Sequence, residues 1–113
     1  MFKISLNRIH DKVRITEGDE HLELRVDGDP MRMVAGLNEA QRRLKTITEN
    51  MPESEQSEIA GYFAGVIFGA EQAKALADFY HDDVACIINI CGQYFRDRLA
   101  GLIVKAQKKL KLK

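Results

Sequence analysis

The chain has 113 residues, and its 17 Lys and Arg are balanced by 17 Asp and Glu. An apolar content of 45% is too high for a disordered protein, and zero net charge argues against a uniformly basic nucleic-acid domain. The longest nearly continuous apolar run, residues 59–70, is too short to cross a bilayer, and no apolar leader follows Met1. We therefore expect one domain over residues 1–113, with no membrane span and no secretory signal.

The N-terminal part of the chain has the pattern of a small antiparallel sheet. Apolar residues alternate with polar ones in residues 2–6, 13–15 and 22–26. Gly18 in the polar turn predicts a hairpin over residues 12–27, because glycine tolerates positive φ. Residues 2–6 are expected to add a third strand, with His10 and Asp11 in the connection. The solvent face of the hairpin is predicted to carry Lys12, Arg14, Glu23 and Arg25.

Two helices are predicted after the sheet. Asp29 is a good N-cap and Pro30 suits the first helical position. Helical spacing of apolar residues then continues toward Glu49, just ahead of Pro52. A second helix should run from Pro52 to about Phe68, because acids in its first turn complement the helix dipole.

The second helix carries glycines four residues apart, at Gly61, Gly65 and Gly69. A mid-helix glycine costs about 1 kcal/mol relative to alanine, which suggests that close approach of another helix repays the cost. We favour packing within the molecule, and a self-association face is the alternative. Gly69 is expected to end or bend the helix.

The last part of the chain is predicted to form a short helix and a long one. The short helix spans Ala70 to about Tyr80, and His81-Asp82-Asp83 ends it and caps the next. Apolar residues then keep a period of 3.6 from Asp83 to Leu110. The predicted fold class is α+β, with an N-terminal antiparallel sheet followed by about four helices, the last one long.

The two cysteines indicate a reducing compartment. Cys86 and Cys91 are five residues apart on the last predicted helix, so their side chains point about 140° apart. That geometry suits neither a disulfide nor a pair of metal ligands. Both are expected to be small core residues in the cytoplasm.

The zero net charge conceals a strong asymmetry. Residues 49–83 hold eight acidic and one basic side chain, whereas residues 84–113 hold seven basic and one acidic. The basic excess includes a tail, residues 105–113, that contains Lys105, Lys108, Lys109, Lys111 and Lys113. Three arrangements stay open: the charged segments meet within one molecule, they meet between copies or partners, or the tail is simply solvated.

No sequence motif indicates an enzyme. The chain lacks a phosphate-binding glycine loop, a zinc-protease motif and a nucleophile elbow. The cluster at His81-Asp82-Asp83 is explained by helix capping better than by a metal site. We expect no catalytic residue, no metal and no cofactor. The basic last helix leaves a DNA- or RNA-binding or regulatory adaptor protein as the alternative function.

One family resemblance rests on the C-terminal part of the chain. An Ile67-Phe68-Gly69 step precedes a short helix, an aromatic–acidic junction at 79–83 and a long helix containing residues 90–95 and a lysine-rich tail. With the N-terminal hairpin, this order resembles the small tail assembly chaperones of long-tailed bacteriophages and prophages. The motif match covers residues 67–113, and the basic ending differs from the more acidic relatives.

The resemblance implies a non-enzymatic role in virion assembly. Such chaperones coat the long helical tape measure protein until tail tube subunits polymerise around it. They self-associate and act in the host cytoplasm. The resemblance implies that the tape measure protein and the tail tube protein are partners. We also expect a homo-oligomer, no membrane contact and no nucleic-acid partner. The candidate interaction residues are Gly61, Gly65, Gly69, Lys105, Lys108, Lys109 and Lys111.

Overall fold

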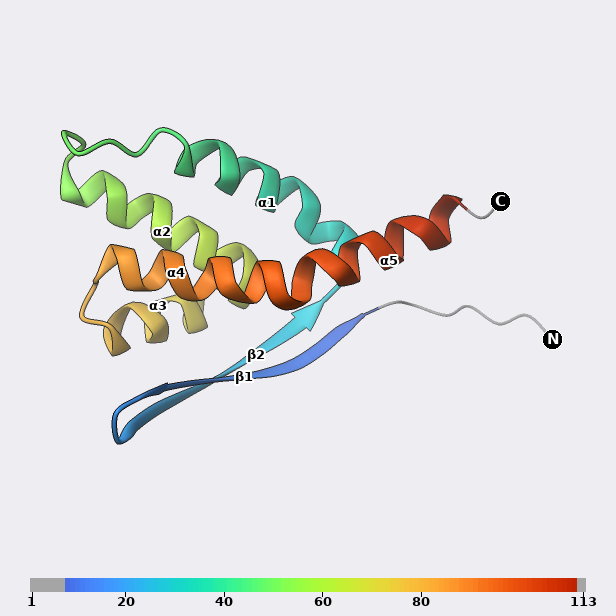
Figure 1. The fold of residues 1–113 in the computed structure, drawn as a ribbon, viewed down its shortest axis with the longest axis horizontal. Coiled ribbons are helices and arrows are strands. Elements are labelled where there is room, and N and C mark those ends of the chain that lie inside the picture. The colour runs from blue at the N-terminus through green and yellow to red at the C-terminus, as the bar shows by residue number, and fades with distance from the viewer. Residues whose placement is uncertain (1–7, 112–113) are drawn as a thin grey trace.

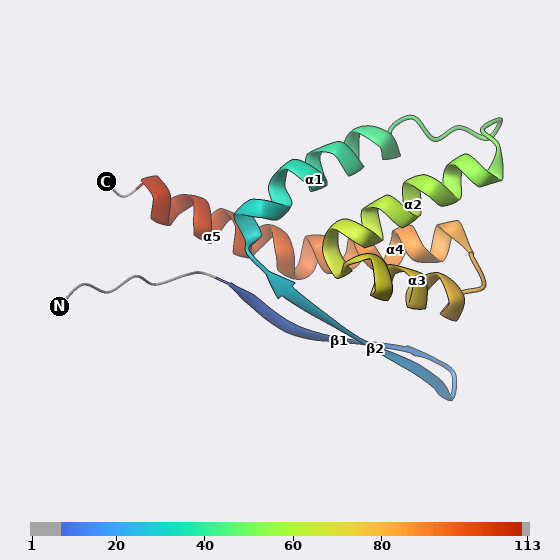
Figure 2. The ribbon, with the colours of Figure 1, turned by 180° about the vertical axis from the view of Figure 1, so that it is seen from behind.

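The structure, a computed structural model, describes the backbone of residues 8–111 and the side chains as far as Lys108. A β-hairpin lies along one side of a group of helices, and this α+β order agrees with the prediction (Figures 1 and 2). The elements are β1 (Ile9–Glu17), β2 (Glu20–Gly28), α1 (Pro30–Leu44), α2 (Glu53–Phe68), α3 (Ala70–Phe79), α4 (Val84–Tyr94), η1 (Phe95–Leu99) and α5 (Ala100–Lys111).

The hairpin is longer than predicted. The two strands pair antiparallel from Ile9↔Gly28 to Glu17↔Glu20, and Gly18 has the positive φ of 60° that a tight hairpin turn requires. His10 and Asp11 were expected in a connection, but they lie inside β1, where Nδ1 of His10 is 2.9 Å from Oδ1 of its partner Asp27. Within residues 8–111 the sheet has two strands rather than three, and the predicted strand 2–6 lies outside the described residues.

The two faces of the hairpin differ as the alternation predicted. Ile9, Ile15, Leu24 and Val26 are buried against the helices. The opposite face is exposed and includes the four predicted polar residues, Lys12, Arg14, Glu23 and Arg25. One apolar face therefore closes the core, and the other carries charge into solvent.

Helix α1 begins as predicted and ends earlier. Asp29 caps it by accepting a hydrogen bond from the backbone N–H of Met31 at 2.9 Å, and Pro30 is the first helical residue. The helix stops at Leu44, five residues before the predicted Glu49. The cause is local: Thr46, a β-branched residue with low helix propensity, donates its hydroxyl to the carbonyl of Arg43 at 2.6 Å.

The predicted boundaries around α3 are confirmed. Gly69 separates α2 from α3 with a φ of 85°, in the region that favours glycine. Asp83 then caps α4 by accepting from the backbone N–H of Cys86 at 3.2 Å. His81 and Asp82 form the tight connection before it and both have positive φ. Their location in this turn agrees with the predicted break between the third and fourth helices.

The long C-terminal helix is continuous, but it is not regular throughout. A π-helical segment, η1, lies between α4 and α5. Cys91, Phe95 and Leu99 follow one another at intervals of four, a spacing that drifts around a regular α-helix. The wider i→i+5 turn takes up this drift, so that Cys91 and Leu99 are both fully buried.

One hydrophobic core joins the hairpin to the helices. It contains Leu24 and Val26 of the sheet together with Leu76, Cys91 and Leu99 of the helices, all nearly inaccessible to solvent. Burial raises the pKa of the Cys91 thiol to about 12. Cys86 is only half-buried, so the prediction of a core position holds for Cys91 alone. In the part of the chain that the structure describes, no helix is both long and apolar enough to span a membrane.

Candidate partner-binding surfaces

An apolar groove lies between α1 and the long C-terminal helix. Helices α1 and α4 each pack against α2, and Phe63 of α2 lies between them. The groove has a volume of about 260 Å³. Its apolar lining consists of Leu37 and Leu44 from α1, Phe63 from α2, Ile88 from α4 and Phe95 from η1. Phe95 thus lies in the π-helical segment, a kind of irregularity that is frequent at functional sites.

The rim of the groove is polar. Asn38, Gln41, Asn89 and Arg96 line it and are exposed. A Cβ added at Gly92 would lie 3.2 Å from Nη1 of Arg96, so this guanidinium extends over the glycine. Among the described residues, those that line the groove include no Ser, Cys, His, Asp, Glu or Lys. The groove is therefore equipped for apolar contact with a hydrogen-bonding rim.

The spacing of the lining residues follows the helices. Leu37, Gln41 and Leu44 stand at i, i+4 and i+7 along α1. Ile88, Gly92 and Phe95 repeat the same spacing along α4 and into η1. Each wall is thus a single helical face. Leu37, Leu44, Ile88 and Phe95 follow the apolar spacing of the predicted helices, but nothing in that spacing indicated that the gap between the two faces stays open.

The predicted glycine stripe does not mediate close packing in this molecule. A Cβ built at Gly61, Gly65 or Gly69 meets nothing within 4 Å outside the local helix. The prediction of close packing within the molecule is therefore wrong for these positions. Close approach occurs instead at Gly36 of α1, where a Cβ would lie 2.9 Å from Cγ1 of Val66. Within the described part of the chain, nothing packs at that distance against these three glycine positions.

A cluster of acidic residues and the basic end of α5 lie at opposite ends of the helical layer (Figure 1). Glu49 and Glu53 share a hollow with His81, Asp82 and Asp83, where the α1–α2 and α3–α4 connections lie side by side. The end of α5 projects from the other side of the molecule (Figure 1). Lys105 and Lys108 are exposed on it, and Val104 is 49% exposed. Lys109 and Lys111 also belong to α5, but their side chains are outside the described set.

No salt bridge among the described side chains joins these two charged regions. Of the arrangements left open by the sequence, contact within one molecule therefore has no support here. The His81-Asp82-Asp83 cluster serves the helix junction, and the described residues contain no group of three potential metal ligands.

The hairpin is attached to the helices through polar contacts at both strands. On β1, Asp11 accepts from the hydroxyl of Tyr94 at 2.9 Å and from Nε of Arg98 at 2.7 Å. The Arg98 hydrogen bond, with help from Tyr94, holds the pKa of Asp11 below its ordinary value, although burial opposes the shift. Burial, followed by the hydrogen bond to Asp11, raises the pKa of Tyr94.

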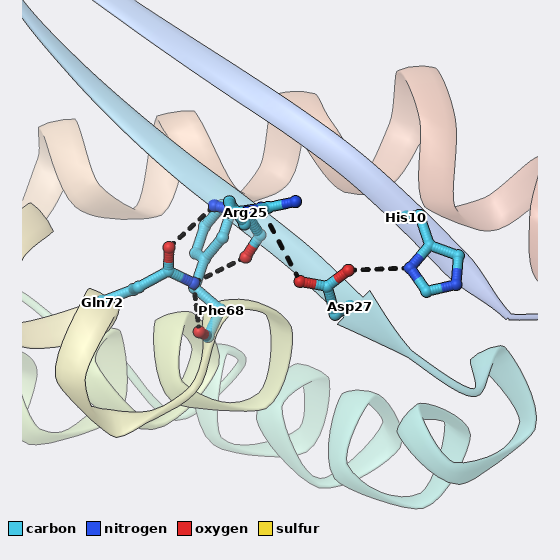
Figure 3. A network of polar contacts seen from close by, with 5 residues as sticks. All are labelled: His10, Arg25, Asp27, Phe68 and Gln72. Carbon is cyan, nitrogen blue, oxygen red and sulfur yellow. Dashed lines mark hydrogen bonds and ion pairs between the residues drawn. The ribbon is translucent and has the colours of Figure 1, made fainter.

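On β2, one glutamine side chain takes the place of a neighbouring strand. Oε1 of Gln72 accepts from the backbone N–H of Arg25 at 2.7 Å, and its Nε2 donates to the Arg25 carbonyl at 2.6 Å (Figure 3). The same Nε2 also donates to the carbonyl of Phe68 at 2.7 Å. No local sequence signal marks Gln72 for this role, because its partner is 47 residues away.

Comparison with known proteins provides no relative for this chain: no family model, no curated protein and no solved structure matches it.

Proposed function

We propose that this chain is a non-enzymatic tail assembly chaperone of a long-tailed phage or prophage that binds the helical tape measure protein in the groove between α1 and α4. The observation that carries the proposal is the groove itself, with its apolar lining and polar rim. An amphipathic helix binds such a groove by placing its apolar face into it, with anchors at i, i+3 or i+4 and i+7. The resemblance of residues 67–113 to tail assembly chaperones supplies the identity of the partner.

The dimensions of the groove suit one helix face better than a small molecule. Its two walls are runs of side chains along two helices, and Phe63 between them provides apolar contact. Asn38 and Asn89 on opposite rims can hydrogen-bond with polar side chains that flank an apolar stripe. A tape measure protein is long and largely helical, so it would present many such stripes in succession.

The charged ends support a head-to-tail arrangement of copies along that partner. The exposed Lys105 and Lys108 of one copy would lie near the hollow that contains Glu49, Glu53 and Asp82 of the next. A contact between two different surfaces that does not close on itself generates an open spiral. Such oligomers would be weakened by salt, because the charges involved are exposed. Tail tube subunits would replace the chaperone in the host cytoplasm.

The test uses two substitutions on the same helix. Asn89 and Gln93 are both exposed on α4, but Asn89 lines the groove and Gln93 lines the hollow beside β1. The partner for the test is the tape measure protein that this proposal expects to be encoded next to this chain's gene. We expect Asn89→Arg to weaken its binding about tenfold or more, equivalent to about 1.4 kcal/mol, and Gln93→Arg to leave it unchanged. Equal affinity of both variants would contradict the groove, and the absence of a tape measure gene nearby would contradict the identity.

The alternative is a small DNA- or RNA-binding or regulatory adaptor protein that uses the basic end. Its support is the pair of exposed lysines, Lys105 and Lys108, on the projecting α5. That function predicts that Lys105→Glu abolishes binding to duplex DNA at moderate salt, whereas Asn89→Arg has no effect. A chain that stays monomeric at high concentration and shifts DNA in a gel would favour this alternative.

A further inference from the structure

We propose that the free edge of β1 binds an extended segment of a partner protein with acidic residues at alternate positions. This inference goes beyond the proposed binding of a helix, and it concerns a different side of α4. Strand addition to an exposed sheet edge is a recurrent mode of peptide recognition, in which backbone hydrogen bonds provide affinity and alternate side chains provide specificity.

The ladder shows which backbone groups of β1 point away from β2. Gln72 binds both the N–H and the carbonyl of Arg25 from outside the sheet, so these groups face away from β1. Lys12 is the residue directly opposite Arg25, and the two do not hydrogen-bond to each other. In such a pair of an antiparallel sheet, the backbone N–H and carbonyl of both residues point away from the partner strand. The same orientation recurs at Arg14 and Thr16. Within residues 8–111, no backbone or side-chain hydrogen bond from outside the hairpin reaches the backbone of these three residues.

A hollow lies beside this edge on its inner side. It has a volume of about 380 Å³ and lies between β1 and α4. Val13 and Ile15 of β1 line its apolar part, together with Tyr80, Ile90 and Tyr94 from the helical side. Its polar part is lined by Arg14, Thr16, Gln93 and Asp97. A strand added to β1 would direct every second side chain toward this hollow, because side chains alternate between the two faces of a sheet. Small or branched apolar side chains would fit there.

The charges of the outer face select the other side chains of the partner. Lys12 and Arg14 are exposed, and no salt bridge in the described structure involves either. Side chains on the outer face of an added strand would lie directly beside them, at the distance where opposite charges stabilise a sheet and like charges destabilise it. Acidic residues are therefore favoured at alternate positions of the bound segment.

The same charges disfavour a second copy as the occupant. Two β1 edges paired antiparallel through their outward groups place His10, Lys12, Arg14 and Thr16 opposite one another. In every register Lys12 and Arg14 then face a basic residue or threonine, and never an acid. Basic side chains on an edge strand are a known protection against self-pairing. They leave the edge available to a partner of opposite charge.

The experiment measures amide hydrogen exchange in the full chain with a capped peptide in which glutamate alternates with valine. We expect exchange at the amides of Lys12, Arg14 and Thr16 to slow at least about tenfold when the peptide is saturating. The amide of Arg25 should not change, because Gln72 already binds it. A matched peptide with lysine in place of glutamate should have no effect. Binding of the glutamate peptide without slowing of the three amides would overturn the proposal.

A charge-reversed variant makes the test independent of one peptide. The double variant Lys12→Glu and Arg14→Glu alters exposed side chains without salt bridges, so it is expected to fold, and circular dichroism checks this. It should prefer the lysine peptide over the glutamate peptide. Unchanged preference would overturn the proposal. Protection of the three amides in the chain without peptide would also overturn the proposal. Protection at low chain concentration would mean that residues 1–7 cover the edge. Protection that increases with chain concentration would mean that a second copy covers it.

Discussion

The two edges of the hairpin have opposite roles. On the β2 edge, Gln72 of α3 binds the backbone of Arg25 on both sides and connects the sheet to the helices (Figure 3). On the β1 edge, no hydrogen bond from the described helices reaches the outward backbone groups of Lys12 and Arg14, and β1 is held instead through its inner face by Asp11. One edge therefore serves the fold of the single chain, and the other is the edge for which we propose a partner.

Helix α2 repeats this contrast. Its face toward α1 is closed so tightly that Gly36 leaves no room for a methyl group beside Val66. On its glycine face, a methyl group added at Gly61 or Gly65 would meet no described atom within 4 Å outside the local helix. Some surfaces of the hairpin and of α2 are thus packed within the chain, and others are not. Substitutions on the packed surfaces should lower stability more than substitutions on the others.

The largest effect is expected at Asp11, the polar attachment of β1 to the long helix. Asp11→Ala should lower the free energy of unfolding by about 1–3 kcal/mol, because the hydroxyl of Tyr94, a half-buried residue, loses its partner. Asp19→Ala at the exposed hairpin turn is the control and should change stability by less than about 0.5 kcal/mol. Chemical denaturation measures both. Equal effects would mean that the inner face of β1 needs no attachment.

The stability that Asp11 contributes should depend on pH in a defined direction. The pKa of Asp11 is lower in the folded chain than in the unfolded chain, chiefly because of the Arg98 hydrogen bond. Its contribution is therefore complete above the ordinary Asp pKa of about 3.9 and is lost as the pH falls through the lower folded value. The stability gap between the wild type and Asp11→Asn should narrow over that range. A gap that stays constant from neutral pH to strong acid would contradict the ion pair.

The next largest effect is the difference in stability between two glycine-to-alanine substitutions, one on α1 and one on α2. Gly61→Ala should raise the free energy of unfolding by about 0.5–1 kcal/mol, because alanine favours helix and the added methyl meets nothing. Gly36→Ala should be less stable than Gly61→Ala by about 1–3 kcal/mol, because its methyl would lie 2.9 Å from a carbon of Val66. Thermal or chemical denaturation of both variants gives the comparison. Equal stabilisation would show that the two faces of α2 are packed alike.

The smallest effects compare the two sheet edges directly. Gln72→Ala should cost about 1 kcal/mol, since water can partly replace its hydrogen bonds at this exposed edge. Lys12→Ala should stay within about 0.5 kcal/mol of the wild type, because its side chain is exposed and forms no salt bridge. Glu71→Ala, on the same helix as Gln72 and exposed, is a control for helix propensity. A loss at Lys12 as large as that at Gln72 would contradict the contrast between the edges.

Local signals were sufficient for most of the fold. The hairpin, the Asp29-Pro30 start of α1, the break at Gly69 and the cap at Asp83 each depend on a few neighbouring residues. Such features follow from backbone preferences and capping hydrogen bonds, which the chain carries wherever it is placed. Their success explains why the order of the elements was predicted correctly.

Features that depend on distant contacts could not be predicted. The glycine spacing of α2 suggested a close contact, but only the packing of whole helices decides that Gly36 makes it and Gly61 does not. The π-helical segment at Phe95 depends on which residues of the long helix face the core. The groove itself is a gap between helices that both contact α2, and its lining residues resemble ordinary core residues in sequence.

We propose that a helix of the tape measure protein binds in the groove between α1 and α4. The most direct measurement is the hydrogen-exchange footprint of that partner on this chain. We predict protection in the segments 37–44 and 88–96, which contain the two walls of the groove. Exchange at the exposed lysines of α5 should change little, apart from an effect of contact between copies. Protection confined to α5, with exchange in both groove walls unchanged, would contradict the account.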